Sequence, residues 1–104
     1  MRKILPEVVR LTASAFNETQ VILSELEGKI LHENVQELKE SEVQVIISEW
    51  AITIAKLGAD VKGLWLVDFD NGNGYYCWKY GEDDILYEHT YESGFAGRKP
   101  INEE

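Results

Sequence analysis

The sequence contains a single cysteine, two prolines and two histidines among its 104 residues. Because Cys77 has no second cysteine to pair with, an internal disulfide framework is excluded. No Cys-x-x-Cys, His-x-His or Glu-x-x-His spacing occurs, and these spacings are typical of structural zinc sites and of metal sites in helical bundles. From these absences we expect neither a bound metal nor a cofactor.

Basic residues are also scarce. The chain has 10 Lys and Arg against 19 Asp and Glu, and its formal net charge is -9. Between Asp60 and Glu92, eight acidic residues stand against only Lys62 and Lys79. Nucleic acids and acidic membrane surfaces are bound through basic patches, so the charge excludes both as partners.

Long hydrophobic runs are missing too. The longest apolar stretch falls far short of the roughly 20 residues that span a membrane. The first residues, Met1 to Pro6, are not followed by the apolar run of a secretory signal peptide. We therefore expect a soluble, cytoplasmic protein.

What the sequence does have, in its first half, is helical periodicity. From Ile4 to about Leu31 the apolar positions recur in steps of three and four, which predicts an amphipathic helix with Pro6 in its first turn. Such a helix would be roughly 35–40 Å long, which is more than a domain this small needs for its own core. We expect part of it to contact another molecule.

A second helix is predicted from Val35 to Leu57. The short polar connection from Leu31 to Asn34 favours an antiparallel return. Apolar side chains lie on more than one side of this helix, which indicates burial on two faces, one by the first helix and one by a partner subunit.

The second half predicts three strands joined by tight turns. Alternating apolar residues mark strands at 64–69, 75–80 and 85–91, separated by the turn signals Asp70–Gly74 and Gly81–Asp84. A two-residue first loop pairs Val67 with Tyr76, and a four-residue second loop pairs Tyr80 with Ile85.

This register divides the side chains between two faces. A core face against the helices would carry Trp65, Val67, Phe69, Tyr76, Trp78, Tyr80, Ile85, Tyr87 and His89. The opposite face would carry Leu64, Leu66, Asp68, Tyr75, Cys77, Lys79, Leu86, Glu88 and Thr90. A one-residue change in either loop would exchange the faces.

The motifs of this half resemble those of a known family. They are Val67-Asp-Phe69, Cys77-Trp78, Gly81-Glu82, His89 and Gly94-Phe-Ala-Gly-Arg98, followed by Pro100. Together they are similar to the signature of the domain-of-unknown-function family 2203 of bacteria and archaea, whose members also open near a Leu-Pro pair. The resemblance implies a helical N-terminal half followed by a short β region. The family has no established activity, so the resemblance implies a fold and a set of residues rather than a function.

Five residues in these motifs carry ionisable or nucleophilic side chains, namely His89, Asp68, Glu82, Arg98 and Cys77. A metal or acid–base centre would combine His89 with a thiol or carboxyl group. The predicted register opposes it, because His89 falls on one face and both Asp68 and Cys77 fall on the other. Nucleophilic catalysis by Cys77 and His89 needs an exposed thiolate, whereas a mid-strand cysteine is normally an inert buried thiol.

A structural interpretation accounts for more of these residues. Arg98 would form a bidentate pair with Asp68 or Glu82 and fasten the glycine-rich tail across the sheet, while His89 would hydrogen-bond a neighbour. The same arginine is equally suited to one wall of an anion pocket, and the sequence leaves both possibilities open.

The sequence thus predicts an α+β fold, a long antiparallel helical hairpin packed on a three-stranded antiparallel meander with a C-terminal glycine-rich loop. We expect one domain over residues 1–104, with a helical half at 4–57 and a β half with its tail at 63–101. The favoured function is a homo-oligomeric structural or interaction module that associates through its helices. The alternative is a small enzyme or ligand-binding domain with a pocket around His89, Asp68 and Arg98, possibly metal-dependent.

Overall fold

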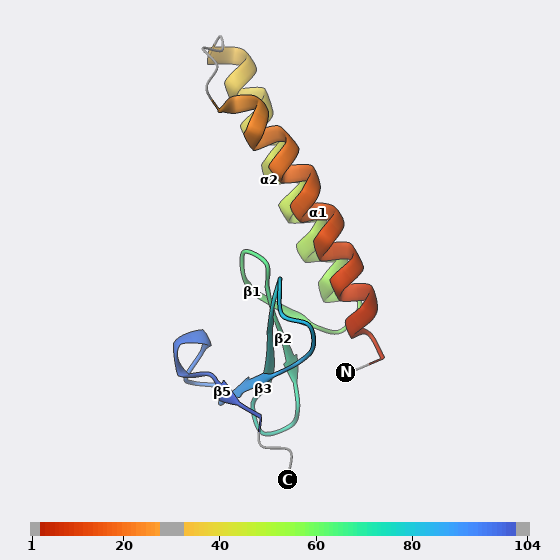
Figure 1. Ribbon diagram of the computed structural model, residues 1–104, viewed down its shortest axis with the longest axis vertical. Coiled ribbons are helices and arrows are strands. Elements are labelled where there is room, and N and C mark those ends of the chain that lie inside the picture. The colour runs from red at the N-terminus through yellow and green to blue at the C-terminus, as the bar shows by residue number, and fades with distance from the viewer. Residues whose placement is uncertain (1–2, 28–32, 102–104) are drawn as a thin grey trace.

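A computed structural model describes residues 3–27 and 33–101 of the protein. Helix α1 spans Leu5–Leu26 and helix α2 spans Glu33–Lys56, and the two form an antiparallel hairpin (Figure 1). Residues 31 and 32 of the predicted connection lie outside the described part of the chain. Neither helix, over the residues that the structure describes, has the length and hydropathy needed to cross a lipid bilayer.

Both helices follow from their sequence signals. Pro6 lies in the first turn of α1, where a backbone N–H would have no partner within the helix, so its absence in proline costs no helical hydrogen bond. The residues that α1 buries recur in steps of three and four, and they are Leu5, Val8, Thr12, Ala15 and Thr19. Gly58, with a φ of +93°, directly follows the last turn of α2, a backbone conformation that glycine adopts without steric cost.

Five antiparallel strands follow in sequential order, β1-β2-β3-β4-β5. Their bounds are β1 Asp60–Gly63, β2 Leu66–Asp70, β3 Tyr75–Lys79, β4 Tyr87–His89 and β5 Lys99–Pro100. The α+β class and the antiparallel meander are confirmed, but the expectation of three strands is wrong, because short β1 and β5 extend the sheet at its two edges.

The chain turns between β1 and β2 at Trp65, which has a φ of +62°. The predicted strand therefore begins at Leu66 rather than at Leu64. From this turn the indole packs against Phe16 and Trp50, with ring centroids 5.7 and 4.9 Å away. Contact with the helices outweighs the strand propensity of the local sequence here.

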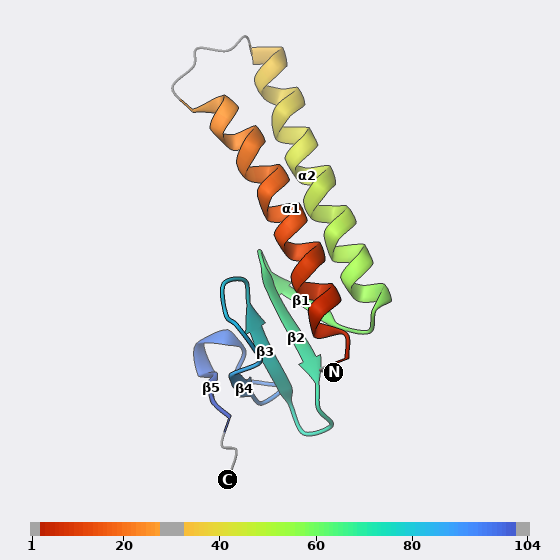
Figure 2. The same cartoon turned by 45° about the vertical axis from the view of Figure 1, so that its right-hand side comes forward.

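One face of the sheet packs against the sheet-proximal ends of the helices (Figure 2). The buried apolar core comprises Leu5, Val8, Ala15, Trp50, Ile54, Ala59, Val67, Phe69, Trp78 and Ile85. Within it, the Trp50 indole N–H donates to Thr12 Oγ1 at 2.9 Å, so the polar atoms of that contact are satisfied.

The other ends of the helices project away from the sheet (Figures 1 and 2). The molecule measures 56 × 25 × 23 Å and has a radius of gyration of 16.1 Å, whereas a compact chain of this length has about 13 Å. No described residue in 20–27 or 33–49 is buried. The projecting half of the hairpin therefore has no core of its own beyond the contact between the two helices.

The first β-hairpin has a longer loop than predicted. Asp70 pairs with Tyr75 around a four-residue loop, and the Asp70 carboxylate accepts the Gly72 N–H at 2.8 Å within it. Val67 consequently lies opposite Trp78 rather than Tyr76. Since the shift is two residues, each side chain stays on its predicted face.

The predicted β3–β4 register is wrong by one residue. Cys77 lies opposite Tyr87, and Tyr75 lies opposite His89. The connection between the two strands is longer than the predicted turn at 81–84, since β3 ends at Lys79 and β4 begins at Tyr87; within it the Glu82 carboxylate accepts the Lys79 N–H at 2.8 Å. An odd shift exchanges faces, so Tyr87 and His89 leave the predicted core face.

Candidate functional site

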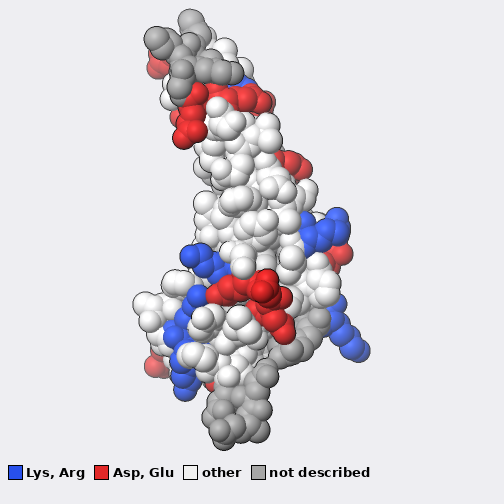
Figure 3. Space-filling model, viewed as in Figure 1, with Lys and Arg blue, Asp and Glu red and all other residues white. Residues whose placement is uncertain are grey.

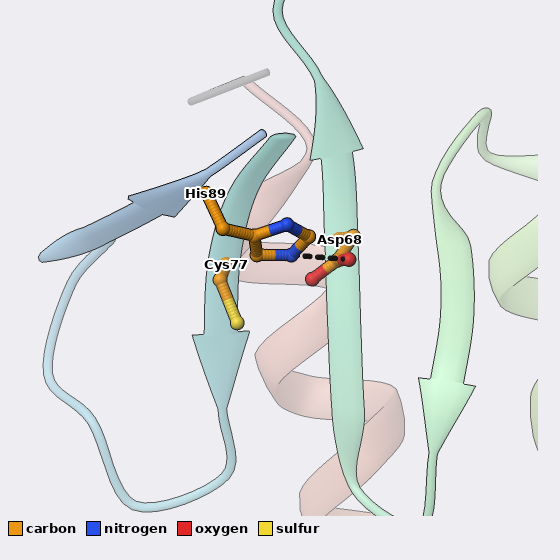
Figure 4. Close-up of side chains that lie close together, drawn as sticks. All are labelled: Asp68, Cys77 and His89. Carbon is orange, nitrogen blue, oxygen red and sulfur yellow. Dashed lines mark hydrogen bonds and ion pairs between the residues drawn. The ribbon is translucent and has the colours of Figure 1, made fainter. Parts of the chain in front are cut away.

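The corrected register brings three of the predicted site residues together. Asp68 on β2 lies directly opposite Cys77 on β3, and His89 on β4 lies next to them on the same face. In Figure 4 these side chains point toward one another in front of the strands, while α1 passes behind the sheet. We call Asp68, Cys77 and His89 the polar cluster. Its convergence removes the geometric argument against a metal centre.

The polar cluster is enclosed by protein. Asp68 is 1% exposed, Cys77 is 0% exposed and His89 is 6% exposed. The potential ligand atoms of the three side chains all lie within 4.8 Å of one another. Buried ionisable groups are rare unless they are paired or hold an ion, so this cluster calls for a physical account.

Hydrogen bonds fix the imidazole of His89. Its Nδ1 lies 2.7 Å from the carbonyl oxygen of Thr90, and its Nε2 lies 2.7 Å from Asp68 Oδ2. A carbonyl oxygen only accepts, so Nδ1 carries a proton. A second proton must lie between Nε2 and the Asp68 carboxyl group for that contact to be a hydrogen bond. The remaining oxygen, Asp68 Oδ1, is buried and has no hydrogen-bond partner among residues 3–27 and 33–101.

Cys77 completes the cluster as a neutral thiol. Burial is the main factor that raises the pKa of Cys77, to about 12, and the neighbouring Asp68 carboxylate adds to it. Both ring nitrogens of His89 already have partners, so neither is available to take the thiol proton. The arrangement therefore does not support nucleophilic catalysis by a Cys77–His89 pair.

Arg98 and Glu82 form the second polar feature of this face. Arg98 Nη2 lies 2.8 Å from Glu82 Oε2, and Nη1 lies 3.1 Å from Oε1, which makes the pair bidentate. The guanidinium stacks between the rings of Tyr87 and Phe95, 4.0 and 4.4 Å from their centroids. Of the two partners that the sequence left open, Glu82 is the one that fastens the tail.

The arginine also connects the two features, since its Nη1 lies 4.0 Å from Cys77 Sγ. A hollow of about 130 Å3 beside the histidine is lined by Asn71, Asn73, Gly74, Glu88, His89, Thr90 and Lys99. Neither Asp68 nor Arg98 lines this hollow. A common pocket around His89, Asp68 and Arg98 stays a prediction.

Two neighbours of the cluster were not recognised from the sequence. The Thr90 carbonyl is a backbone group, and no residue type signals it. Gly74 lets the chain pass close to His89, because a Cβ built there would lie 2.4 Å from the His89 carbonyl oxygen. The sequence offered Gly74 only as a turn residue.

A separate candidate surface lies on the projecting half of the helical hairpin. Its exposed apolar side chains are Val21 at 59%, Leu23 at 43%, Val35 at 40%, Leu38 at 65% and Val45 at 54%. We call these five residues the distal hairpin surface; they face more than one side of the hairpin, since Val21 and Leu23 lie about 200° apart around the axis of α1. A shallow, mainly apolar depression beside it is lined by Ile22, Leu38, Ser41, Glu42, Val45 and Ile46.

Comparison with known proteins identifies the family but no activity. The model of a family described as an uncharacterized conserved protein, DUF2203, matches residues 1–101. No curated protein and no solved structure matches the chain. Because the family model covers nearly the whole sequence, the chain belongs to the DUF2203 family of uncharacterised conserved proteins.

Proposed function

We propose that this protein is a small cytoplasmic interaction module that self-associates through the distal hairpin surface. One observation carries the proposal. Half of a long helical hairpin stands clear of the sheet; its described residues, 20–27 and 33–49, include no buried one, and branched apolar side chains are exposed on it.

The energetics of helices support a covering partner. Isolated helices owe little stability to their own backbone, and packing of an apolar face supplies most of it. In the projecting half that packing is limited to one seam between α1 and α2, strengthened by an ion pair between Lys39 and Glu25. A second hairpin packed on the side that carries Leu38 and Val45 would cover the apolar depression there and complete a four-helix bundle.

The size of the surface fits a dimer. Residues 33–49 of α2 extend about 25 Å, and two helices side by side are about 20 Å wide. One copy therefore presents a flat, projected area of roughly 500 Å2. The accessible surface is larger than this projection because side chains protrude from it, which brings it toward the about 800 Å2 that each partner buries in a standard interface. On the face in Figure 3, uncharged surface covers most of the middle of the hairpin, although the chain is acidic overall.

Leu38→Glu tests the proposal, with Leu64→Glu as its matched control. Both leucines are strongly exposed, at 65% and 58%, but Leu64 lies at the turn between β1 and β2. We expect light scattering and sedimentation to show a dimer for the wild type and for Leu64→Glu at micromolar concentration. A symmetric dimer contains Leu38→Glu in both copies, and each substitution removes about 2 kcal/mol of binding free energy from apolar burial. The dissociation constant of the dimer should therefore rise by at least a hundredfold. A monomeric wild type, or equal weakening by both substitutions, would refute the proposal.

A further inference from the structure

We propose that the polar cluster of Asp68, Cys77 and His89 binds one divalent transition-metal ion of the zinc class. The proposal is independent of self-association, because the cluster lies on the sheet, away from the distal hairpin surface.

The donor atoms select this class of ion. One imidazole nitrogen, one sulfur and one carboxylate oxygen form a mixed set that suits Zn2+ and its spectroscopic substitute Co2+. Mg2+ and Ca2+ prefer oxygen ligands throughout, so the sulfur of Cys77 disfavours them. Three protein ligands are the number found in zinc sites that keep one coordination position for water or another small ligand.

The geometry requires only small movements. Ligand atoms about 2.0–2.3 Å from a tetrahedral ion are roughly 3.3–3.8 Å from one another. The atoms of the polar cluster all lie within 4.8 Å of one another, and the His89 Nε2–Asp68 Oδ2 distance is 2.7 Å. Opening that contact by less than about 1 Å and bringing Cys77 Sγ inward makes room for an ion. Side-chain rotation supplies such displacements without a change of the sheet.

Two features indicate that the polar cluster binds a ligand and does not serve only as a hydrogen-bonded part of the protein interior. Asp68 Oδ1 is a buried carboxylate oxygen without a hydrogen-bond partner in the described part of the chain, and such atoms are rare in native proteins. His89 Nδ1 donates to the Thr90 carbonyl, which leaves Nε2 as the coordinating nitrogen. Metal-binding histidines are usually oriented by a hydrogen bond of this kind on the other nitrogen.

Charge is balanced when the ion enters. The metal-free cluster holds one proton between His89 Nε2 and Asp68 and another on the Cys77 thiol, and its net charge is zero. Binding displaces both protons, and the resulting carboxylate and thiolate neutralise the two charges of the ion. A buried site therefore gains no uncompensated charge, and metal binding releases two protons.

Arg98 acts as a positioning residue beside this site. Its Nη1 lies 4.0 Å from Cys77 Sγ, the atom that becomes a thiolate when the metal ion binds. The bidentate pair with Glu82 neutralises the guanidinium, so the arginine offers an N–H donor to the sulfur without adding net charge.

Cobalt binding to the full-length protein, freed of metal with a chelator, tests the proposal. We expect one equivalent of Co2+ to bind, with the visible bands of a tetrahedral complex and a near-ultraviolet thiolate-to-cobalt charge-transfer band. Zn2+ should displace the cobalt. X-ray absorption of the wild-type zinc complex should show one sulfur among nitrogen and oxygen neighbours, and this readout requires no variant to fold.

Matched variants locate the site. Cys77→Ser should abolish the charge-transfer band, and Asp68→Asn should weaken cobalt binding at least tenfold. Two control variants should leave the charge-transfer band and the cobalt affinity unchanged. They are Asp70→Asn, which lies on the same strand as Asp68, and His32→Gln, which changes the other histidine of the chain. Absence of stoichiometric binding, a zinc complex without sulfur, or equal loss in the control variants would overturn the proposal. The first result would leave the polar cluster as a hydrogen-bonded structural element.

Discussion

The pair of Arg98 and Glu82 should stabilise the C-terminal segment by a measurable coupling energy. Two N–H···O bonds of 2.8 and 3.1 Å join the side chains, each of which is 16% exposed. A hydrogen bond to a charged group contributes about 1.5–3 kcal/mol, and partial exposure to water reduces that figure. We therefore expect a coupling of about 2–3 kcal/mol between the two side chains.

A double-mutant cycle isolates this coupling. Arg98→Met removes the guanidinium that lies over Tyr87 and Phe95 but keeps an unbranched side chain, and Glu82→Gln keeps an oxygen that can accept the Lys79 N–H. In urea titrations, Arg98→Met should lower the unfolding free energy by about 3–4 kcal/mol, because stacking interactions of about 0.5–1 kcal/mol each are weakened along with the pair. Glu82→Gln should cost about 2–3 kcal/mol, and the double variant should cost less than the sum of the two.

Hydrogen exchange separates global from local effects. The Ile101 amide donates to the Leu86 carbonyl at 3.0 Å, so it reports whether the tail stays on the sheet. If the tail opens by itself, Arg98→Met should accelerate exchange at this amide more than at amides of β2 and β3. A coupling below about 0.5 kcal/mol, with unchanged exchange at Ile101, would refute the assignment of Arg98 as the residue that fastens the tail.

Two further predictions concern the surroundings of the polar cluster. Above pH 9 the metal-free wild type should lose stability more steeply than Cys77→Ser, by up to about 1.4 kcal/mol per pH unit, in urea titrations at several pH values. Folding raises the pKa of the Cys77 thiol to about 12. The neutral thiol therefore contributes its full stability below the pKa of cysteine in the unfolded chain, and this stability is lost as the pH rises toward the pKa in the folded protein. Parallel pH profiles of the two proteins would contradict the prediction. Gly74→Ala should cost about 1–3 kcal/mol in chemical unfolding, because its Cβ would meet the His89 carbonyl at 2.4 Å. Gly63→Ala is its control, with no neighbour closer than 3.8 Å, and equal stability of the two variants would show that the close approach is not a constraint.

Periodicity was sufficient to predict the helices and the class of the fold. Apolar steps of three and four placed α1, and the predicted end of the second helix at Leu57 lies one residue from the observed end at Lys56, because these patterns depend on local backbone geometry. The alternation in β2 and β3 placed Val67 and Trp78 on the core face, and an even error in the loop left that result intact.

The candidate site depended on contacts that local pattern does not encode. Glu82 reaches back to the Lys79 N–H, and this single side chain–backbone bond accompanies the odd shift that carries His89 to the face of Asp68 and Cys77. Arg98 pairs with Glu82 rather than with Asp68, whose Oδ2 contacts His89 Nε2 instead, and the local sequence pattern does not encode this choice. Turn-forming residues indicate that the chain reverses direction, but they determine the pairing register of the two strands only when the loop is short and regular.

Solution NMR tests the convergence of the polar cluster most directly, through cross-strand nuclear Overhauser effects between β3 and β4. The account predicts contacts between the backbone protons of Cys77 and Tyr87 and between those of Tyr75 and His89. Pairing of Trp78 with Tyr87 and of Tyr76 with His89 would return the histidine to the core face and contradict the account.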